Sequence, residues 1–114
     1  MDGSTRQMTG TVGGGPQVTL VSFTATGERV RAVLRWQTSA ERNCQGFHLY
    51  RAESGTDAFV QINSSLVPGK SPAGGSYRFN DMTVQPSSTY DYRLFAVGLQ
   101  GQLVLLQSVT AETP

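Results

Sequence analysis

The amino-acid sequence predicts an all-β protein, built as an antiparallel β-sandwich of seven strands. From Val18 onward, apolar and polar residues alternate with a period of two, as they do in half-buried strands. Turn-forming pairs such as Thr26-Gly27 and Pro68-Gly69 separate the alternating runs. No stretch carries a helical apolar stripe of useful length. Short strands at this spacing therefore indicate a sandwich.

Residues 29–37 form the clearest predicted strand. Its polar outward side is interrupted only by Val33. The residues expected on its inward side are Val30, Ala32, Leu34 and Trp36. Because this side is uniformly apolar, we expect it to face the core.

Six further strands are predicted at 18–25, 46–52, 58–62, 76–80, 89–97 and 103–110. In the first of them the apolar residues change parity between Leu20 and Val21, which a β-bulge or a change of sheet would explain. In the last, both parities are apolar, so the sequence leaves its inward side open.

Length and composition fit one domain that folds without a cofactor or metal. The chain has 114 residues, of which 38% are hydrophobic and 15% charged, with a formal net charge of +1. A chain of this size buries roughly 65% of its unfolded surface, which is enough for a core. The near-neutral charge argues against a nucleic-acid partner. No apolar run approaches the roughly 20 residues of a membrane span, so we expect no membrane insertion.

Residues 1–17 are expected to form a flexible, Gly-rich N-terminal arm or leader, and residues 18–114 the sandwich. The arm has almost no large apolar side chains and contains Gly13-Gly14-Gly15, so alone it cannot offset the entropy of ordering. It also lacks the positive and apolar blocks of a signal peptide. We expect the arm to be mobile in dilute solution.

Several residues together resemble a fibronectin type III domain. Trp36 lies in the second predicted strand, and Gly46-Phe47 opens the third. Val84, Pro86 and Tyr90 stand at the spacing that the family shows before its sixth strand. The resemblance implies an immunoglobulin-like sandwich, with the Tyr90 hydroxyl bonding back to the chain near Val84 or Pro86 as a tyrosine corner.

The block WQTSAERNCQGFHLYRA, from Trp36, looks more narrowly like a bacterial variety of the family. Such domains recur in large secreted or surface proteins, so the resemblance implies an extracellular or cell-surface location. It implies roles in adhesion, spacing, structure or protein–protein interaction, because this fold hosts them all. The proline that often follows the Trp in animal domains is absent, and so is Arg-Gly-Asp, so animal-type receptor functions and integrin binding are not supported.

The residue inventory argues against an enzyme. The chain has one cysteine, Cys44, which we expect to be a bystander thiol, and one histidine, His48, which we expect on a strand surface. The carboxylates, Glu41 and Asp81 among them, are expected in turns or outward positions with no inward pair for acid–base work. A zinc site would need about four nitrogen or sulfur ligands, and only Cys44 and His48 are candidates. Asp57 or Asp81 could contribute to a calcium site, although Asp81 fits a turn residue accepting backbone N–H bonds better.

Trp36, Tyr90 and Tyr92 are expected in the core. An exposed Trp36 would instead suggest a carbohydrate-binding platform, but it shares a side with Ala32 and Leu34. Asn63-Ser64-Ser65 matches a glycosylation acceptor pattern, which is short and matches often by chance.

Two outward surfaces are candidates for binding. A weak basic stripe of Arg31, Arg35 and Arg78, with no acid among them, could contact a glycan or another polyanion; an ordinary solvated surface is the alternative. The opposite sheet is expected to present a candidate interface of His48, Tyr50, Phe95 and Val97. Either Leu103 and Leu105 or Val104 and Leu106 would join this interface, depending on the parity of the last strand.

The leading functional hypothesis is a non-catalytic interaction or spacer module of a bacterial extracellular or surface protein. Its partner would be another protein or a second copy of itself, with a glycan as a weaker candidate. One alternative is a structural subunit that polymerises into a filament or surface layer. The other is an accessory carbohydrate-binding module of a secreted enzyme.

Overall fold

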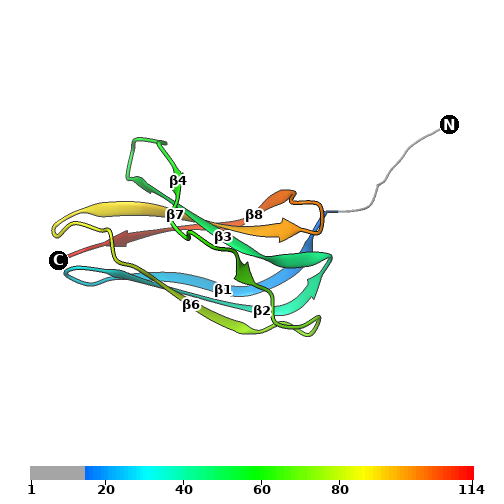
Figure 1. Ribbon diagram of the computed structural model, residues 1–114. Helices are drawn as coiled ribbons and strands as arrows, with labels where there is room; N and C mark the ends of the chain where they lie inside the picture. Colours follow the sequence, from blue (N-terminus) through cyan, green and yellow to red (C-terminus); the bar gives the residue numbers. More distant parts are fainter. Residues whose placement is uncertain (1–14) are drawn as a thin grey trace.

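The computed structural model, which describes residues 15–114, is a sandwich of two antiparallel sheets (Figure 1). The smaller sheet has the order β1–β2–β6, with β1 at Gln17–Gly27, β2 at Ala32–Arg42 and β6 at Ser76–Asp81. The larger has the order β4–β3–β7–β8, with β3 at Cys44–Glu53, β4 at Val60–Gln61, β7 at Thr89–Gly98 and β8 at Leu103–Glu112. A short β5, Val67–Pro68, also pairs with β3. The predicted immunoglobulin-like sandwich is confirmed, with eight strands in place of seven.

Differences between predicted and observed strands are local. The predicted strand at 58–62 contracts to β4, and β5 was not predicted because two residues give no alternation. β2 begins at Ala32, and Val30 lies in the turn before it with 61% of its surface exposed. The backbone N–H of Glu28 donates to the carbonyl of Arg31 at 2.7 Å, which closes this turn. The inward position expected for Val30 is therefore wrong.

The parity change in the first strand is explained by a bulge. The β1–β2 register shifts on either side of Leu20, so that Phe23 opposes Trp36 while Val21 points to solvent. The bulge lets β1 direct both Leu20 and Phe23 toward the core despite their odd separation.

Aromatic side chains from both sheets fill the core around Trp36. The Trp36 ring stacks on Tyr77 at a centroid distance of 5.3 Å and meets Phe47 edge-on at 5.7 Å. Phe23 packs against Trp36 from β1 at 6.4 Å. Tyr90 and Tyr92 are also buried. The core is therefore continuous from the smaller sheet to the larger one.

The two ends of the described chain lie at opposite ends of the sandwich (Figure 1). Pro16 is buried beside Gly98 in the β7–β8 hairpin, whereas Gly27 contacts the backbone of Glu112 at the other end. Residues 1–14, most of the predicted N-terminal arm, lie outside the described residues. Within residues 15–114, no helix is long and apolar enough to cross a membrane.

Candidate interaction surface

The side of the larger sheet that faces away from the core is the candidate site, called here the outer face. It consists of His48, Tyr50, Phe95, Val97, Leu103 and Leu105. Directly paired residues of antiparallel strands point to the same side of a sheet. His48 pairs with Phe95, which pairs with Leu105, and Val97 pairs with Leu103. The three strands thus bring the four predicted interface residues to one surface.

A bulge settles the parity of β8. The β7–β8 register shifts between Leu94 and Phe95, which leaves Leu106 as the extra residue and directs Leu103 and Leu105 outward. Leu106 packs against the core. Of the two alternatives, Leu103 and Leu105 therefore join the outer face.

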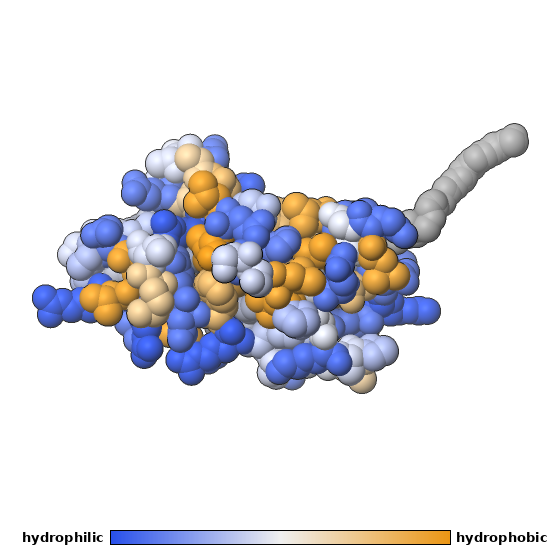
Figure 2. Space-filling view, in the orientation of Figure 1, coloured by the Kyte–Doolittle hydropathy of each residue, from blue (hydrophilic) through white to orange (hydrophobic). Residues whose placement is uncertain are grey.

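Half of the exposed large hydrophobic residues of the described chain lie on β8 and the hairpin before it. Leu99 is 60% exposed, Leu103 45% and Leu105 48%. Val97 is buried, and His48, Tyr50 and Phe95 are half-buried. Figure 2 shows orange side chains near the end of the molecule where the β7–β8 hairpin lies, and further ones across the middle of the visible face. Alternation identified the centre of this surface and left its part on β8 open between two pairs of residues, whereas the exposed Leu99 was not predicted.

Aromatic and polar contacts fix the middle and rim of the outer face. The Tyr50 and Phe95 rings meet edge-on at 5.1 Å. The Arg93 guanidinium lies 3.9 Å above the Phe59 ring. At the rim, Asp91 accepts hydrogen bonds from the Ser54 and Thr110 hydroxyls, which lower the pKa of its carboxyl.

His48 is positioned by a buried asparagine. Asn63 Nδ2 donates to His48 Nδ1 at 2.9 Å and to the Ser65 carbonyl, also at 2.9 Å, while its Oδ1 accepts the Leu49 N–H at 2.8 Å. Asn63 therefore provides a hydrogen-bond partner for the backbone of β3 in the gap between β4 and β5. Because it is only 2% exposed, a glycan on Nδ2 does not fit the folded chain, and the glycosylation reading of Asn63-Ser64-Ser65 is corrected.

The smaller sheet brings together only part of the basic stripe. Arg35 on β2 lies directly opposite Arg78 on β6. Arg31 precedes β2 and forms an ion pair with Glu28 at 2.6 Å. The expectation of a stripe without an acid is therefore wrong at Arg31, and two arginines remain side by side.

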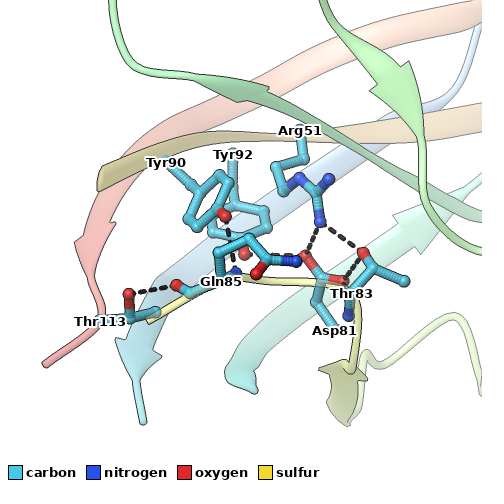
Figure 3. A network of polar contacts seen from close by, with 7 residues as sticks. All are labelled: Arg51, Asp81, Thr83, Gln85, Tyr90, Tyr92 and Thr113. Atoms are coloured by element: carbon cyan, nitrogen blue, oxygen red, sulfur yellow. Dashed lines mark hydrogen bonds and ion pairs between the residues drawn. The ribbon is translucent and has the colours of Figure 1, made fainter. Parts of the chain in front are cut away.

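A buried carboxylate, Asp81, organises one end of the sandwich (Figure 3). It accepts hydrogen bonds at 2.9 Å from Arg51 Nη1 and from the Tyr92 hydroxyl. Thr83 donates both its N–H and its hydroxyl. Burial raises the pKa of Asp81, but the hydrogen bonds from Thr83 and Arg51 outweigh it, so the net pKa is lowered. The expected backbone-capping turn is present, and both oxygens are occupied by protein donors.

Glu41 is buried at the other end of β2. Its Oε2 accepts the Tyr77 and Thr38 hydroxyls, each at 2.5 Å. Burial and the bond to Glu41 raise the pKa of Tyr77. The carboxylate borders a hollow of about 280 Å³ that Lys70 and Cys44 also line. The turn or outward position expected for Glu41 is thus wrong, because the Tyr77 hydroxyl, distant in sequence, bonds to its carboxylate inside the protein. Asp81 accepts the backbone N–H bond expected of a turn residue, but it is buried rather than exposed.

Cys44 is half-buried and donates its S–H to the Gly46 carbonyl at 3.3 Å. Burial raises the pKa of the thiol, which favours its protonated form over the thiolate. In the described part of the chain, no group of three or more His, Cys, Asp and Glu residues could hold a metal ion.

The chain matches no protein-family model and no curated protein sequence. It is similar in structure to an Fn3-like protein from Clostridium thermocellum, with a TM-score of 0.65 and 15% identity over 89% of this chain and 96% of that one. A β-1,2-glucanase from Parabacteroides distasonis matches with a TM-score of 0.61 and 14% identity, over 89% of this chain but 14% of the enzyme. The pectate lyase PelI from Erwinia chrysanthemi, in complex with tetragalacturonic acid, matches with a TM-score of 0.53 and 17% identity, over 85% of this chain and 28% of the enzyme. The fold is therefore fibronectin type III-like, as the sequence predicted.

Proposed function

We propose that this domain is a non-catalytic module of a bacterial extracellular or surface protein, and that its outer face binds another protein. The observation that carries the proposal is the exposure of Leu103 and Leu105 beside the Tyr50–Phe95 pair. Monomeric domains rarely expose contiguous apolar patches of this kind unless a partner covers them. Aromatic anchors with aliphatic neighbours are also typical of the centres of protein interfaces.

The polar side chains support a structural rather than a chemical role. The carboxylates of Glu41 and Asp81 accept hydrogen bonds from neighbouring side chains, and burial raises the pKa of the Cys44 thiol. A nucleophile needs an adjacent base with an orienting group, and the described residues do not provide that arrangement. The domain would act by presenting a rigid surface.

A second candidate is an accessory module of a polysaccharide-degrading enzyme, because the fold recurs as a minor part of a glucanase and a pectate lyase. Direct sugar binding would be expected to use exposed aromatic rings. Among the described residues, the exposed large hydrophobic side chains are all aliphatic or methionine, such as Leu99 and Met82. Within such an enzyme, a spacer or protein-contact role is therefore favoured over sugar binding.

Sedimentation velocity of a charge-bearing double variant tests the proposal. We expect the wild-type chain to associate at high protein concentration, and Tyr50→Glu with Phe95→Glu should abolish that association, because it places two carboxylates in the outer face. Thr24→Glu with Gln37→Glu, both exposed on the smaller sheet, adds the same charge elsewhere and should leave association unchanged. Circular dichroism checks that both variants fold. Association that persists undiminished in the Tyr50/Phe95 variant would contradict the proposal.

A further inference from the structure

We infer that β8 pairs edge to edge with β8 of a second copy of this chain. The inference rests on the proposed function and deepens it, because it names the partner. β8 is the last strand of its sheet and, within residues 15–114, pairs as a strand with β7 alone. Its other side therefore presents backbone N–H and C=O groups on which a further strand can form a ladder.

The other sheet edges carry features that oppose such pairing. β4 and β5 are two residues each, and β6 directs Arg78 and Asn80 outward. β1 is interrupted by the bulge at Leu20. Short strands, charges and bulges are the usual ways in which proteins blunt a sheet edge. By contrast, residues 99–111 contain no charged side chain, and the bulge of β8 comes only at Leu106.

The first residues of β8 are apolar and exposed on both sides of the sheet. Leu103 and Leu105 point outward, and both are almost half exposed. Val104 opposes the buried Ala96 and so points to the core side, yet 39% of it is exposed. A strand added here would cover apolar surface on both sides of the sheet, in addition to forming backbone hydrogen bonds.

The pattern of these residues is self-complementary. In an antiparallel pair with a two-fold axis at Val104, Leu103 of each copy lies opposite Leu105 of the other, and Val104 lies opposite itself. Leu103 and Leu105 already share the outer face, so the pairing keeps like side chains on the same side. The paired segment, Gln102–Leu106, ends at the bulge. Its outer side continues the row formed by Val97 and Phe95.

Charge and symmetry favour a second copy as the occupant. A like-charged edge would repel its own copy, whereas this segment is neutral. A two-fold contact uses the same surface on both chains and closes, which is the commonest symmetry of soluble oligomers. The competing occupant is residues 1–14 of the same chain, because the described chain begins at Gly15, where an added Cβ would lie 3.9 Å from Val104 Cγ2.

A charge-swap experiment on the full chain tests the pairing by sedimentation velocity, from micromolar to millimolar protein. Val104→Lys and Val104→Glu should each weaken dimerisation roughly tenfold or more, because like charges then oppose each other across the axis. An equimolar mixture of the two should dimerise again, because lysine opposes glutamate. Ser76→Lys, on the exposed edge strand β6, is the matched control and should leave the dimer unchanged.

A second pair of variants tests the pairing independently, in case the substitutions at Val104 prevent folding. Leu103→Lys and Leu105→Glu change more exposed residues. In the proposed register each charge lies opposite a leucine when a variant is alone and opposite the other charge when the two are mixed, so the mixture should dimerise more tightly than either variant. Circular dichroism and Trp36 fluorescence report whether each variant folds. Restoration by mixing in either pair supports the two-fold pairing, since misfolded chains would not regain association.

The remaining outcomes separate this inference from the proposed function. If Tyr50→Glu with Phe95→Glu abolishes association while the Val104 variants leave it intact, β8 pairing is overturned and the outer-face proposal stands. If mixing restores dimers but the Tyr50/Phe95 variant associates normally, β8 pairing stands and the outer-face proposal falls. A chain that stays monomeric at millimolar concentration overturns the pairing. Dimers that appear only after removal of residues 1–14 also overturn it, because the arm would then occupy the edge.

Discussion

The Gln85 backbone N–H donates a hydrogen bond to the Tyr90 hydroxyl at 2.8 Å, which ties the β6–β7 connection to β7 (Figure 3). The sequence placed this bond near Val84 or Pro86, and the donor is the residue between them. Because the hydroxyl accepts the bond, its removal leaves a backbone donor without a partner.

Tyr90→Phe should lower the free energy of unfolding by about 1 kcal/mol or more, the effect of leaving a shielded N–H unpaired. The ring stays in the core, so the fold should be retained. Urea melts of wild type and variant measure the difference. Equal midpoints and slopes would mean that the bond contributes nothing.

Trp36→Ala should lower the free energy of unfolding by about 3–5 kcal/mol, because the ring packs against Phe23, Phe47 and Tyr77. That loss is large enough to threaten folding of a marginally stable domain. In the wild type, Trp36 fluorescence should be blue-shifted and resist acrylamide quenching. A readily quenched, red-shifted emission would contradict the core position and revive the carbohydrate-platform hypothesis.

Stability should fall in acid through Asp81. Its pKa is lowered in the folded state, so its contribution is fully present above the unfolded value of about 3.9 and is lost as pH falls through the folded value. Asp81→Asn should lower stability at pH 7 by about 2 kcal/mol, since it leaves Arg51 without its anion. Urea melts between pH 7 and pH 2 should show a smaller pH dependence in the variant. An unchanged pH dependence would mean that other carboxylates cause the loss of stability in acid.

Asn63→Ala should lower the free energy of unfolding by about 1–3 kcal/mol, because the Leu49 N–H loses its acceptor inside the protein. Ser64→Ala, exposed and next in sequence, is the control and should have little effect. Thermal melts compare the two variants. Mass spectrometry of folded chain exposed to a glycosylating extract should find Asn63 unmodified; a glycan there would contradict the buried position.

Removing residues 1–14 should leave the melting temperature essentially unchanged. β1 begins at Gln17, and Pro16 is buried beside Gly98, so the described sandwich retains its first strand without the arm. Differential scanning calorimetry of the shortened and full chains measures this. A clearly lower melting temperature would show that the arm contributes to the folded state.

Alternation predicted the strands because burial on one side of a sheet imposes a period of two, as in the run from Ala32 to Trp36. The resemblance of Val84, Pro86 and Tyr90 to the fibronectin type III pattern located the tyrosine corner, because all three residues lie close together in sequence. The interface residues Tyr50 and Phe95 could be paired only through the family topology. Local pattern and known topology thus accounted for most of the fold and for the centre of the outer face.

Features that depend on partners distant in sequence were not predictable. Arg51 and Tyr92 reach the buried Asp81 from the other sheet. The buried Glu41 accepts a hydrogen bond from Tyr77, which is 36 residues away in the sequence. The side of β8 was undecided because every residue from Leu103 to Leu106 is apolar, and only the bulge against β7 separates them. These cases share one cause: the contacts depend on two segments that are distant in sequence, and the pattern of either segment alone does not determine them.

The opposite positions of the two chain ends have a mechanical consequence. β1 and β8 both run from the β7–β8 hairpin end toward the end with Pro114 (Figure 1). Tension applied to both ends of the domain would pull β1 backward along its own axis and β8 forward along its own. The ladders that join β1 to β2 and β8 to β7 would then be loaded in shear, so that many hydrogen bonds must fail together rather than one after another. A domain connected in this way would resist extension and would hold its neighbours at a fixed separation under load.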